Sequence, residues 1–323
     1  MTITIQRQKG FSLIELLIAL TLGLLLMAGI LQIFLASKQT YSTNNALSRV
    51  QESGRFAIGF LTDDIRHAGY RGECISTPNN LLNESGAGYD ADLFDLAEIM
   101  DGWDDNVTGD RIHIKYAASL PGVTASGNTP ANANAINLTT ASGVAQGTII
   151  IVSDPLGCDI FQNRNNANAH SLSRGSTGTP GNKNPGSNPF SHAYDSSMEI
   201  LKLQSVRYYL GNNAAGTLRS LRRVNFSTGT AVDEELIEGV QDMQILYGIA
   251  DNNRQISSYV TAGDVTNWGN VVSVRIHLLL VSPDVNVVPE NQIIDFNGAP
   301  VTIEDRRLAQ VFSTTIGIRN RLP

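Results

Sequence analysis

The sequence has few cysteines, few charges and no excess of cations. Only two cysteines, Cys74 and Cys158, occur in 323 residues. This excludes a disulfide-dense miniprotein and leaves too few thiols for a cysteine-only zinc site. Lys and Arg number 23 against 30 acidic residues, for a net charge of −7. An acidic chain forms a phosphate-binding surface only by segregating its cations. No basic stripe is visible, so we expect no nucleic-acid partner.

Charged residues make up only 16% of the chain, whereas hydrophobic residues make up 42%. Such a composition is too apolar for a disordered chain and too poor in Gly and Pro for a fibrous repeat. A chain of this length is expected to form about two domains and is long enough for a sizeable core. The apolar residues are concentrated in the first forty positions, so the N-terminal segment is more hydrophobic than the rest of the chain.

The N-terminal region has the pattern of a membrane anchor. Residues 1–10 contain two cations, Arg7 and Lys9, and no acid, and residues 16–37 then carry no charge. At about 1.5 Å per residue, this run forms a helix about 33 Å long, enough to cross a bilayer. The preceding cations predict a cytoplasmic N-terminus, with the rest of the chain outside. A removable secretory signal has a shorter apolar region and a small-residue cleavage site. We therefore expect a retained single-pass anchor.

Glu15 is the only ionisable side chain between Phe11 and Ser37. A carboxylate in an apolar helix costs several kcal/mol unless it is paired or protonated. Taken alone, the presence of Glu15 is explained as well by a position near the membrane face as by a specific function. Residues 9–15, KGFSLIE, followed by the apolar run, resemble the class III signal of type IV prepilins. The resemblance implies that prepilin peptidase cleaves between Gly10 and Phe11 and methylates the new amine of Phe11. It also implies that Glu15 neutralises this amine, in the same subunit or a neighbouring one.

The helical periodicity continues after the membrane segment. Apolar or small residues recur at steps of three and four and form one stripe of an amphipathic helix: Leu47, Val50, Gly54, Ala57, Ile58, Leu61, Ile65 and Ala68. The first proline is Pro78, so nothing interrupts the helix before that point. The pattern predicts one helix from Phe11 to Ala68, about 87 Å long. We divide it into a leader (1–10), a transmembrane part (11–37) and an amphipathic part (38–69).

Residues 70–323 are expected to form an extracytoplasmic, β-rich head. Strict alternation is clearest where five apolar residues, from Val272 to Leu280, alternate with Ser273, Arg275, His277 and Leu279. Strands are predicted at 111–116, 148–152, 199–210, 217–226, 241–249, 272–280 and 310–318. Residues 161–197 are rich in Asn, Ser, Gly and Pro and predict a long mobile loop. The predicted fold class is α+β and pilin-like, with a long N-terminal helical spine packed on an antiparallel β-sheet head.

Three further segments resemble PilW-type minor pilins: residues 64–72 (DIRHAGYRG), 237–248 (IEGVQDMQILYG) and 318–323 (IRNRLP). The resemblance implies a minor pilin of the type IV pilus that primes assembly, sits at the pilus tip and supports twitching motility and adhesion. It implies as partners prepilin peptidase, other minor pilins, the major pilin and a large tip adhesin. The chain would reside in the inner membrane before assembly and in the cell-surface pilus afterwards.

Two other functions remain open at this point. A J-type pseudopilin of a type II secretion system has a similar spine and fold, and neighbouring genes would distinguish the two. A pilus-borne adhesin or DNA-uptake subunit could instead present the 161–197 segment at the surface. The acidic balance and the absence of basic or aromatic clusters in that segment argue against DNA.

No motif predicts catalysis, a cofactor or a metal. The sequence contains no G-x-S-x-G, P-loop, G-x-G-x-x-G or H-E-x-x-H pattern. The five histidines have no helix-face metal spacing, and His113 and His277 are expected to point outward from strands as surface or inter-strand residues. We therefore expect a protein that is not an enzyme and binds no cofactor.

Cys74 and Cys158 are both placed on the oxidising side of the membrane by the predicted topology. Cys74 closely follows the long helix and Cys158 follows a predicted strand. A disulfide between them would connect the spine to the sheet, and the alternative is a pair of buried free thiols. We predict the disulfide.

Overall fold

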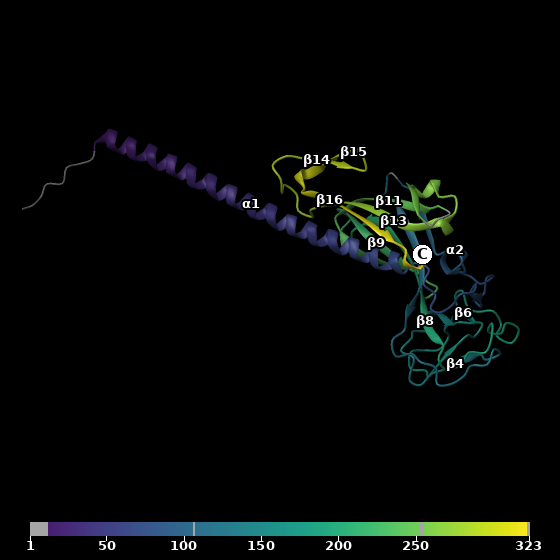
Figure 1. Cartoon of the computed structure of the whole chain (residues 1–323). Coiled ribbons are helices and arrows are strands. Elements are labelled where there is room, and N and C mark those ends of the chain that lie inside the picture. The colour runs from purple at the N-terminus through teal and green to yellow at the C-terminus, as the bar shows by residue number, and fades with distance from the viewer. Residues whose placement is uncertain (1–11, 106, 252–254, 322–323) are drawn as a thin grey trace, which may run out of the picture.

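The computed structural model describes residues 12–105, 107–251 and 255–321. Its dominant element is α1 (Leu13–His67), which extends far beyond the β-rich head at its C-terminal end (Figure 1). With 55 residues, α1 is about 82 Å long. The helix ends one residue before the predicted Ala68. The predicted start at Phe11 lies outside the described residues.

Small residues let the second half of α1 approach the head closely. The buried side of the helix includes Ala46, Gly54 and Ala57, and a Cβ atom at Gly54 would lie only 2.3 Å from the Phe312 ring. Gly54 is therefore required by the close approach of the aromatic ring, although a glycine within a helix costs about 1 kcal/mol. Leu61 and Ile65 continue the buried stripe toward the helix end.

The head contains an eight-stranded sheet and a four-stranded sheet, joined along a shared core. The larger sheet has the order β1-β6-β5-β8-β3-β2, with β9 paired to β8 and β10 paired to β9. All its pairings are antiparallel except that of β1 with β6. Its strands are β1 (Asn79–Asn80), β2 (Met100–Trp103), β3 (Arg111–Ser119), β5 (Ile149–Asp154), β6 (Gly157–Gln162), β8 (Glu199–Asn212), β9 (Arg219–Asn225) and β10 (Val232–Glu238).

The smaller sheet has the order β12-β11-β13-β16 and is antiparallel throughout. Two separate two-stranded sheets, β14–β15 and β4–β7, lie outside the two main sheets. These elements are β4 (Ala135–Asn137), β7 (Ser171–Ser173), β11 (Val240–Ala250), β12 (Ile256–Val260), β13 (Val271–Val281), β14 (Gln292–Phe296), β15 (Ala299–Ile303) and β16 (Ala309–Gly317). The short helices are α2 (Ala91–Phe94) and the 3-10 turns η1 (Ala262–Asp264), η2 (Trp268–Asn270), η3 (Glu304–Arg306) and η4 (Arg319–Arg321).

The main core lies between α1 and the two sheets. It combines the buried stripe of α1 with Ile112 and Ile114 of β3, Tyr208 of β8 and Ile276 of β13. A tight connection at Gly239 joins β10 to β11 and thereby one sheet to the other. Gly239 has φ +86°, and a Cβ atom there would lie 2.5 Å from the Val281 carbonyl oxygen. This position needs glycine for both its conformation and its space.

The segment 161–197, predicted as a mobile loop, is instead packed against the sheet. It contains β7, which pairs with β4. Phe190 and Tyr194 are almost fully buried in a second core with Phe161 and Ile150. Few apolar residues suffice here because side-chain amides satisfy the backbone, as where Asn182 accepts from the Gln162 N–H at 2.6 Å. The composition of this segment correctly predicted an irregular backbone, but the mobility predicted with it was wrong.

His113 is an inter-strand residue, one of the two positions expected for it, but it is buried and not at the surface. The side chain is 1% exposed, its Nε2 lies 2.9 Å from Ser205 Oγ, and Phe226 covers it with ring centroids 6.0 Å apart. His113 does face away from the main core, but loops cover this side of the sheet. His277 is half-buried, and its Nδ1 lies 2.7 Å from Ser313 Oγ on the neighbouring strand.

The burial of His113 makes the head sensitive to acid. Burial, aided by the charges of Lys115 and Arg207, lowers the pKa of His113 from 6.5 to about 3. Since the unfolded chain takes up this proton below pH 6.5 and the folded head does not, stability falls with decreasing pH by about 1.4 kcal/mol per unit between those pKa values. Between pH 6.5 and pH 5, the wild type is expected to lose about 2 kcal/mol of stability through His113. The His113→Gln variant should not show this loss.

Urea unfolding of the full chain in detergent, followed by tryptophan fluorescence at several pH values, measures this effect. His170→Gln is the matched control, because His170 is exposed. Equal pH slopes for the wild type and His113→Gln would show that His113 does not titrate as its burial requires.

Candidate functional site: the spine helix and its joint with the head

The first described residues of α1 place Glu15 in a closed capping arrangement. Ser12 donates to the Glu15 carboxylate from its backbone N–H at 3.0 Å and from its hydroxyl at 3.1 Å, and the Glu15 N–H donates to Ser12 Oγ at 3.3 Å. This reciprocal pairing satisfies backbone donors that have no partner within the helix. Gly10 and Phe11, the expected cleavage site, lie outside the described residues. The structure therefore shows a local partner for Glu15 at the start of the spine.

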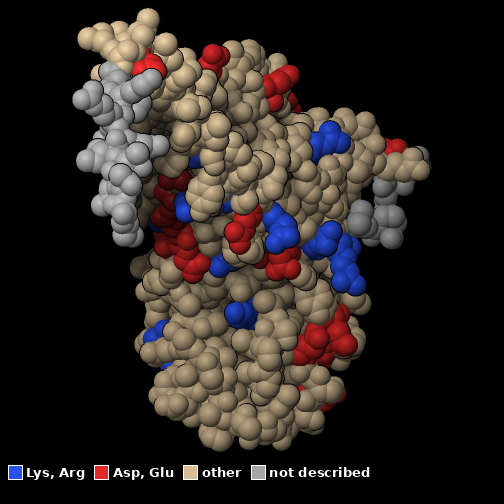
Figure 2. All heavy atoms as spheres, turned by 90° about the vertical axis from the view of Figure 1, so that its left-hand side faces the viewer, with Lys and Arg blue, Asp and Glu red and all other residues tan. Residues whose placement is uncertain are grey.

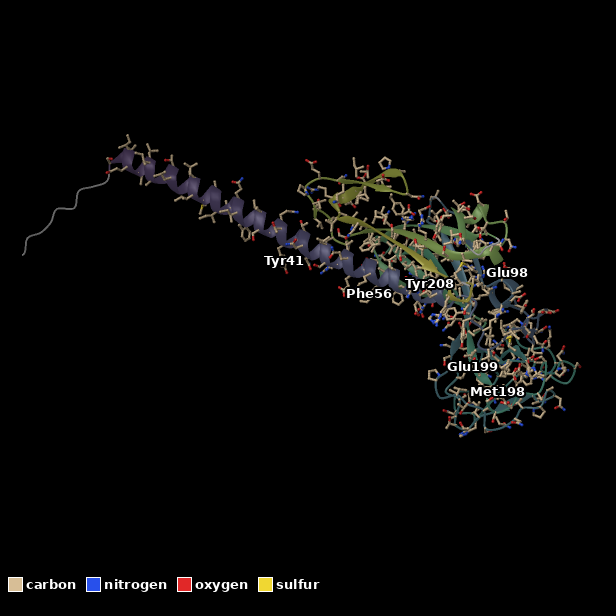
Figure 3. The ribbon with its side chains drawn as sticks, viewed as in Figure 1. Tyr41, Phe56, Glu98, Met198, Glu199 and Tyr208 are labelled. Carbon is tan, nitrogen blue, oxygen red and sulfur yellow. A yellow bond between two sulfur atoms is a disulfide. The ribbon has the colours of Figure 1, made fainter. Side chains whose placement is uncertain are left out.

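Among the residues that the structure describes, the head leaves the apolar run of α1 uncovered. Its large apolar side chains, from Leu13 to Leu35, are between 53% and 78% exposed. Within the described chain, α1 alone is long and apolar enough to cross a membrane. Figure 3 shows these side chains projecting freely from the helix. An apolar surface of this extent needs lipid or other apolar helices around it.

The head first touches the spine just after the apolar run. The Val287 carbonyl accepts hydrogen bonds from Gln39 and, at 2.8 Å, from Thr43 Oγ1. One turn and a half further along, Arg49 lies 3.4 Å from Asp284 of the same loop. The loop before β14 therefore marks the level at which the helix leaves the head.

A buried carboxylate joins the end of α1 to the larger sheet. Asp64 is 5% exposed and accepts hydrogen bonds at 2.5 Å from the hydroxyls of Tyr116 on β3 and Tyr208 on β8. Arg223 on β9 lies 3.9 Å from the same carboxylate. Burial, together with the charge of Asp64, raises the pKa of both tyrosines, so both hydroxyls remain protonated donors. This role was not predicted, although Asp64 lies beside Ile65 within the apolar stripe, where a carboxylate is unusual.

The C-terminal segment caps the other end of the spine. Asn320 Nδ2 donates to the carbonyl of Ala68 at 3.1 Å and to that of His67 at 3.4 Å. These carbonyls have no partner within the helix, so a side-chain donor stabilises the terminus. Two of the PilW-like segments, 64–72 and 318–323, thus meet at one place. We call the contact of Asp64, His67 and Ala68 with the head the joint.

Cys74 and Cys158 form a disulfide in the structure, as predicted. Their Cα atoms are 5.5 Å apart, and 84 residues separate them in sequence. Cys74 lies seven residues beyond the end of α1, and Cys158 belongs to β6. Both cysteines lie in a core with Leu201 and Leu203 of β8. The bridge therefore fixes the chain leaving the spine to the larger sheet.

Within the described part of the chain, no group of three or more His, Cys, Asp or Glu side chains could hold a metal ion. The closest approach to a catalytic constellation is the pair His192–Asp154, at 2.9 Å, with Ser191 Oγ 3.0 Å from His192 Nδ1. The Ser191 hydroxyl, however, donates to Asp159 at 2.7 Å. These bonds hold the 183–197 segment on the sheet, and the serine is not prepared as a nucleophile.

Two family models match the chain. The model described as type IV pilus-assembly protein W matches residues 207–320, and the prokaryotic N-terminal methylation motif matches residues 5–31. A search of curated proteins finds no match. Among solved structures, a type IV-like pilin from Thermus thermophilus has a TM-score of 0.35 at 10% sequence identity, covering 85% of this chain and 99% of that one.

The methylation motif at the start of a long apolar helix, with a β-rich head at the far end, is the arrangement of a membrane-anchored prepilin. The match over residues 207–320 adds a similarity to type IV pilus-assembly protein W, and the two matches together support a minor pilin of type IV pilus assembly. Its role is structural and not enzymatic.

Proposed function

We propose that the chain is inserted once in the inner membrane with its N-terminus in the cytoplasm, is cleaved after Gly10, and then passes into the pilus. There it joins other minor pilins in the complex that primes the filament and remains at its tip. A large tip adhesin and the major pilin are the further partners of this complex. Attachment and twitching motility would then depend on it indirectly, through pilus formation.

The uncovered apolar half of α1 is the observation that carries this proposal. Sixteen large hydrophobic side chains there lie open, from Leu13 to Leu35, and lipid covers them only while the chain is a membrane protein. On extraction, other apolar helices must replace the lipid. A bundle of spines provides such a surface, with each head displayed at the outside.

The match over residues 207–320 supports the pilus in preference to a secretion pseudopilus, because that family is described by pilus assembly. Nothing on the face in Figure 2 resembles a nucleic-acid surface. Its Lys and Arg side chains are interspersed with Asp and Glu, and the lower lobe is mostly uncharged. Protein partners fit this surface better than phosphates do.

The proposal predicts a specific N-terminus and a specific location. Mass spectrometry of the protein recovered from sheared pili should find N-methylated Phe11 as the first residue, with peptides of the chain enriched in tip-bearing fragments. Gly10→Leu is expected to retain Met1 and to keep the chain in the membrane fraction, because a side chain there obstructs the peptidase. Retained residues 1–10 in assembled pili, or absence of the chain from pili, would contradict the proposal.

A further inference from the structure

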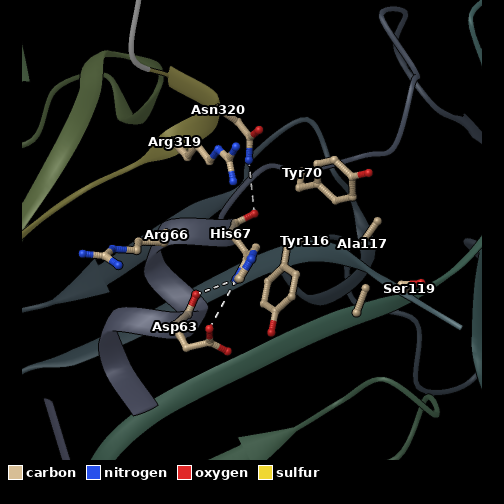
Figure 4. A pocket seen from close by; sticks show the side chains of 10 residues that line it. Asp63, Arg66, His67, Tyr70, Tyr116, Ala117, Ser119, Arg319 and Asn320 are labelled. Carbon is tan, nitrogen blue, oxygen red and sulfur yellow. Dashed lines mark hydrogen bonds and ion pairs between the residues drawn. The ribbon is translucent and has the colours of Figure 1, made fainter. Parts of the chain in front are cut away.

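A cleft of about 710 Å³ lies beside the joint, where the spine ends. Its walls come from three separate parts of the chain: the last turn of α1, the end of β3 and the segment after β16 (Figure 4). The rings of His67 and Tyr116 stack on one side, with centroids 5.8 Å apart, and Tyr70 also lines the cleft. This volume is typical of a site for a small molecule or a short peptide segment.

Two arginines lie at this cleft without a partner. Arg319 extends over His67, Arg66 stands at the rim, and both are exposed. Neither guanidinium group makes a hydrogen bond or an ion pair with another residue that the structure describes. The carboxylate of the cleft, Asp63, is directed to His67, with Oδ1 3.8 Å from Nδ1. The chain has seven more acidic residues than cations, so two guanidinium groups without an acidic partner at one cleft depart from its overall charge balance.

The fold itself brings these cations together. Arg66 belongs to the last turn of α1, and Arg319 follows β16, more than 250 residues later. The hydrogen bonds of Asn320 to the carbonyls of His67 and Ala68 hold the second segment on the first. The site therefore exists only when the joint is formed.

We propose that this cleft binds a carboxylate-bearing peptide segment of a neighbouring pilus subunit, an inference that rests on the proposed function. Arginine pairs with carboxylates through two parallel hydrogen bonds, and such charge-assisted bonds are about twice as strong as neutral ones. The stacked His67 and Tyr116 rings supply apolar surface for the neighbouring part of the segment. A single inorganic anion would leave most of the 710 Å³ unfilled.

The position of the cleft argues against a lipid headgroup as the ligand. The apolar run ends at Ser37 and the cleft begins at Asp63, 26 residues later along one continuous helix. At 1.5 Å per residue, this separation is about 39 Å. The cleft is thus well beyond the membrane surface in the unassembled protein, at a height where another subunit's head can reach it.

Photo-cross-linking in piliated cells tests the proposal on the full chain. A photoreactive amino acid replaces Ser119, which is exposed at the cleft, and a second strain carries it at Ser126, which is exposed elsewhere. We expect the Ser119 probe to link a peptide with an Asp or Glu residue from a different pilus subunit. The double variant Arg66→Gln/Arg319→Gln should lower this yield about tenfold, whereas Arg55→Gln, at an exposed arginine earlier on α1, should not.

Charge reversal makes the result specific. Arg319→Glu should abolish the cross-link, and replacing the linked carboxylate of the partner by Arg or Lys should restore it. An unchanged yield in the double variant, a link to residues 322–323 of the same chain, or a link to lipid would overturn the proposal. Recovery of the chain in pili in these same strains would show that the proposed function holds even when the cleft proposal fails.

Discussion

Replacing both cysteines, Cys74→Ser with Cys158→Ser, is expected to lower the free energy of unfolding of the head by about 4.5 kcal/mol. The bridge closes a loop of 84 residues. In the chain-entropy model, a cross-link of this span removes that amount of free energy from the unfolded state. The double substitution leaves no single thiol to form mixed disulfides. Urea unfolding of the full chain in detergent, monitored by tryptophan fluorescence, measures the change.

Reduced wild-type protein is the control for the cysteine variant. It has the same broken cross-link without the change of side chains, so both proteins should unfold at similar urea concentrations. The loss should appear mainly as a lower midpoint. An unfolding midpoint equal to that of the oxidised wild type would show that the larger sheet holds the start of the head without the bridge.

Substitution of Glu15 by alanine should leave cleavage and membrane level normal but reduce piliation and the recovery of partner subunits by about tenfold or more. Glu15 is the only acidic or basic side chain in the apolar run, so no other residue there can neutralise the amine expected at Phe11. An unpaired charge among apolar helices costs several kcal/mol, and each 1.4 kcal/mol is a factor of ten in binding. Counting pili by electron microscopy and quantifying co-purified subunits measure both effects.

Ser12→Ala separates helix capping from charge pairing at the same place. This variant loses the hydroxyl contacts with Glu15 at 3.1 and 3.3 Å, at a cost of about 1 kcal/mol, but keeps the carboxylate. Its piliation should therefore stay close to normal. If Ser12→Ala and Glu15→Ala impair assembly equally, the carboxylate acts as a helix cap. If neither does, it is dispensable for assembly.

Local patterns were sufficient for the spine and for the central strands. The three- and four-residue spacing from Val50 to Ile65 identified the buried side of α1, because a helix presents every third or fourth residue to one neighbour. Alternation identified β3 and β13 for the corresponding reason in a strand. The disulfide could also be predicted from the sequence, because two cysteines in an oxidising compartment either pair with each other or remain free thiols.

Coverage of the sheet could not be predicted in the same way. Alternation separates the two sides of β3 but does not show that loops cover the side of His113, so the surface or inter-strand position predicted for this histidine did not include its burial. The prediction of a mobile loop at residues 161–197 was wrong for a related reason. Its irregular backbone is held by side-chain amides and by Phe190 and Tyr194, and such contacts leave no period in the sequence.

The sequence by itself was sufficient to predict the long apolar helix, the prepilin-like signal, the α+β class and the pairing of Cys74 with Cys158, since each prediction rests on composition, spacing, the resemblance to prepilins or the expected compartment. Only the tertiary structure decided the joint and its cleft. Asp64 meets Tyr208 across 144 residues, and Asn320 reaches Ala68 across 252. Contacts over such separations depend on how strands pair and on where a helix ends in space, and no local pattern encodes either.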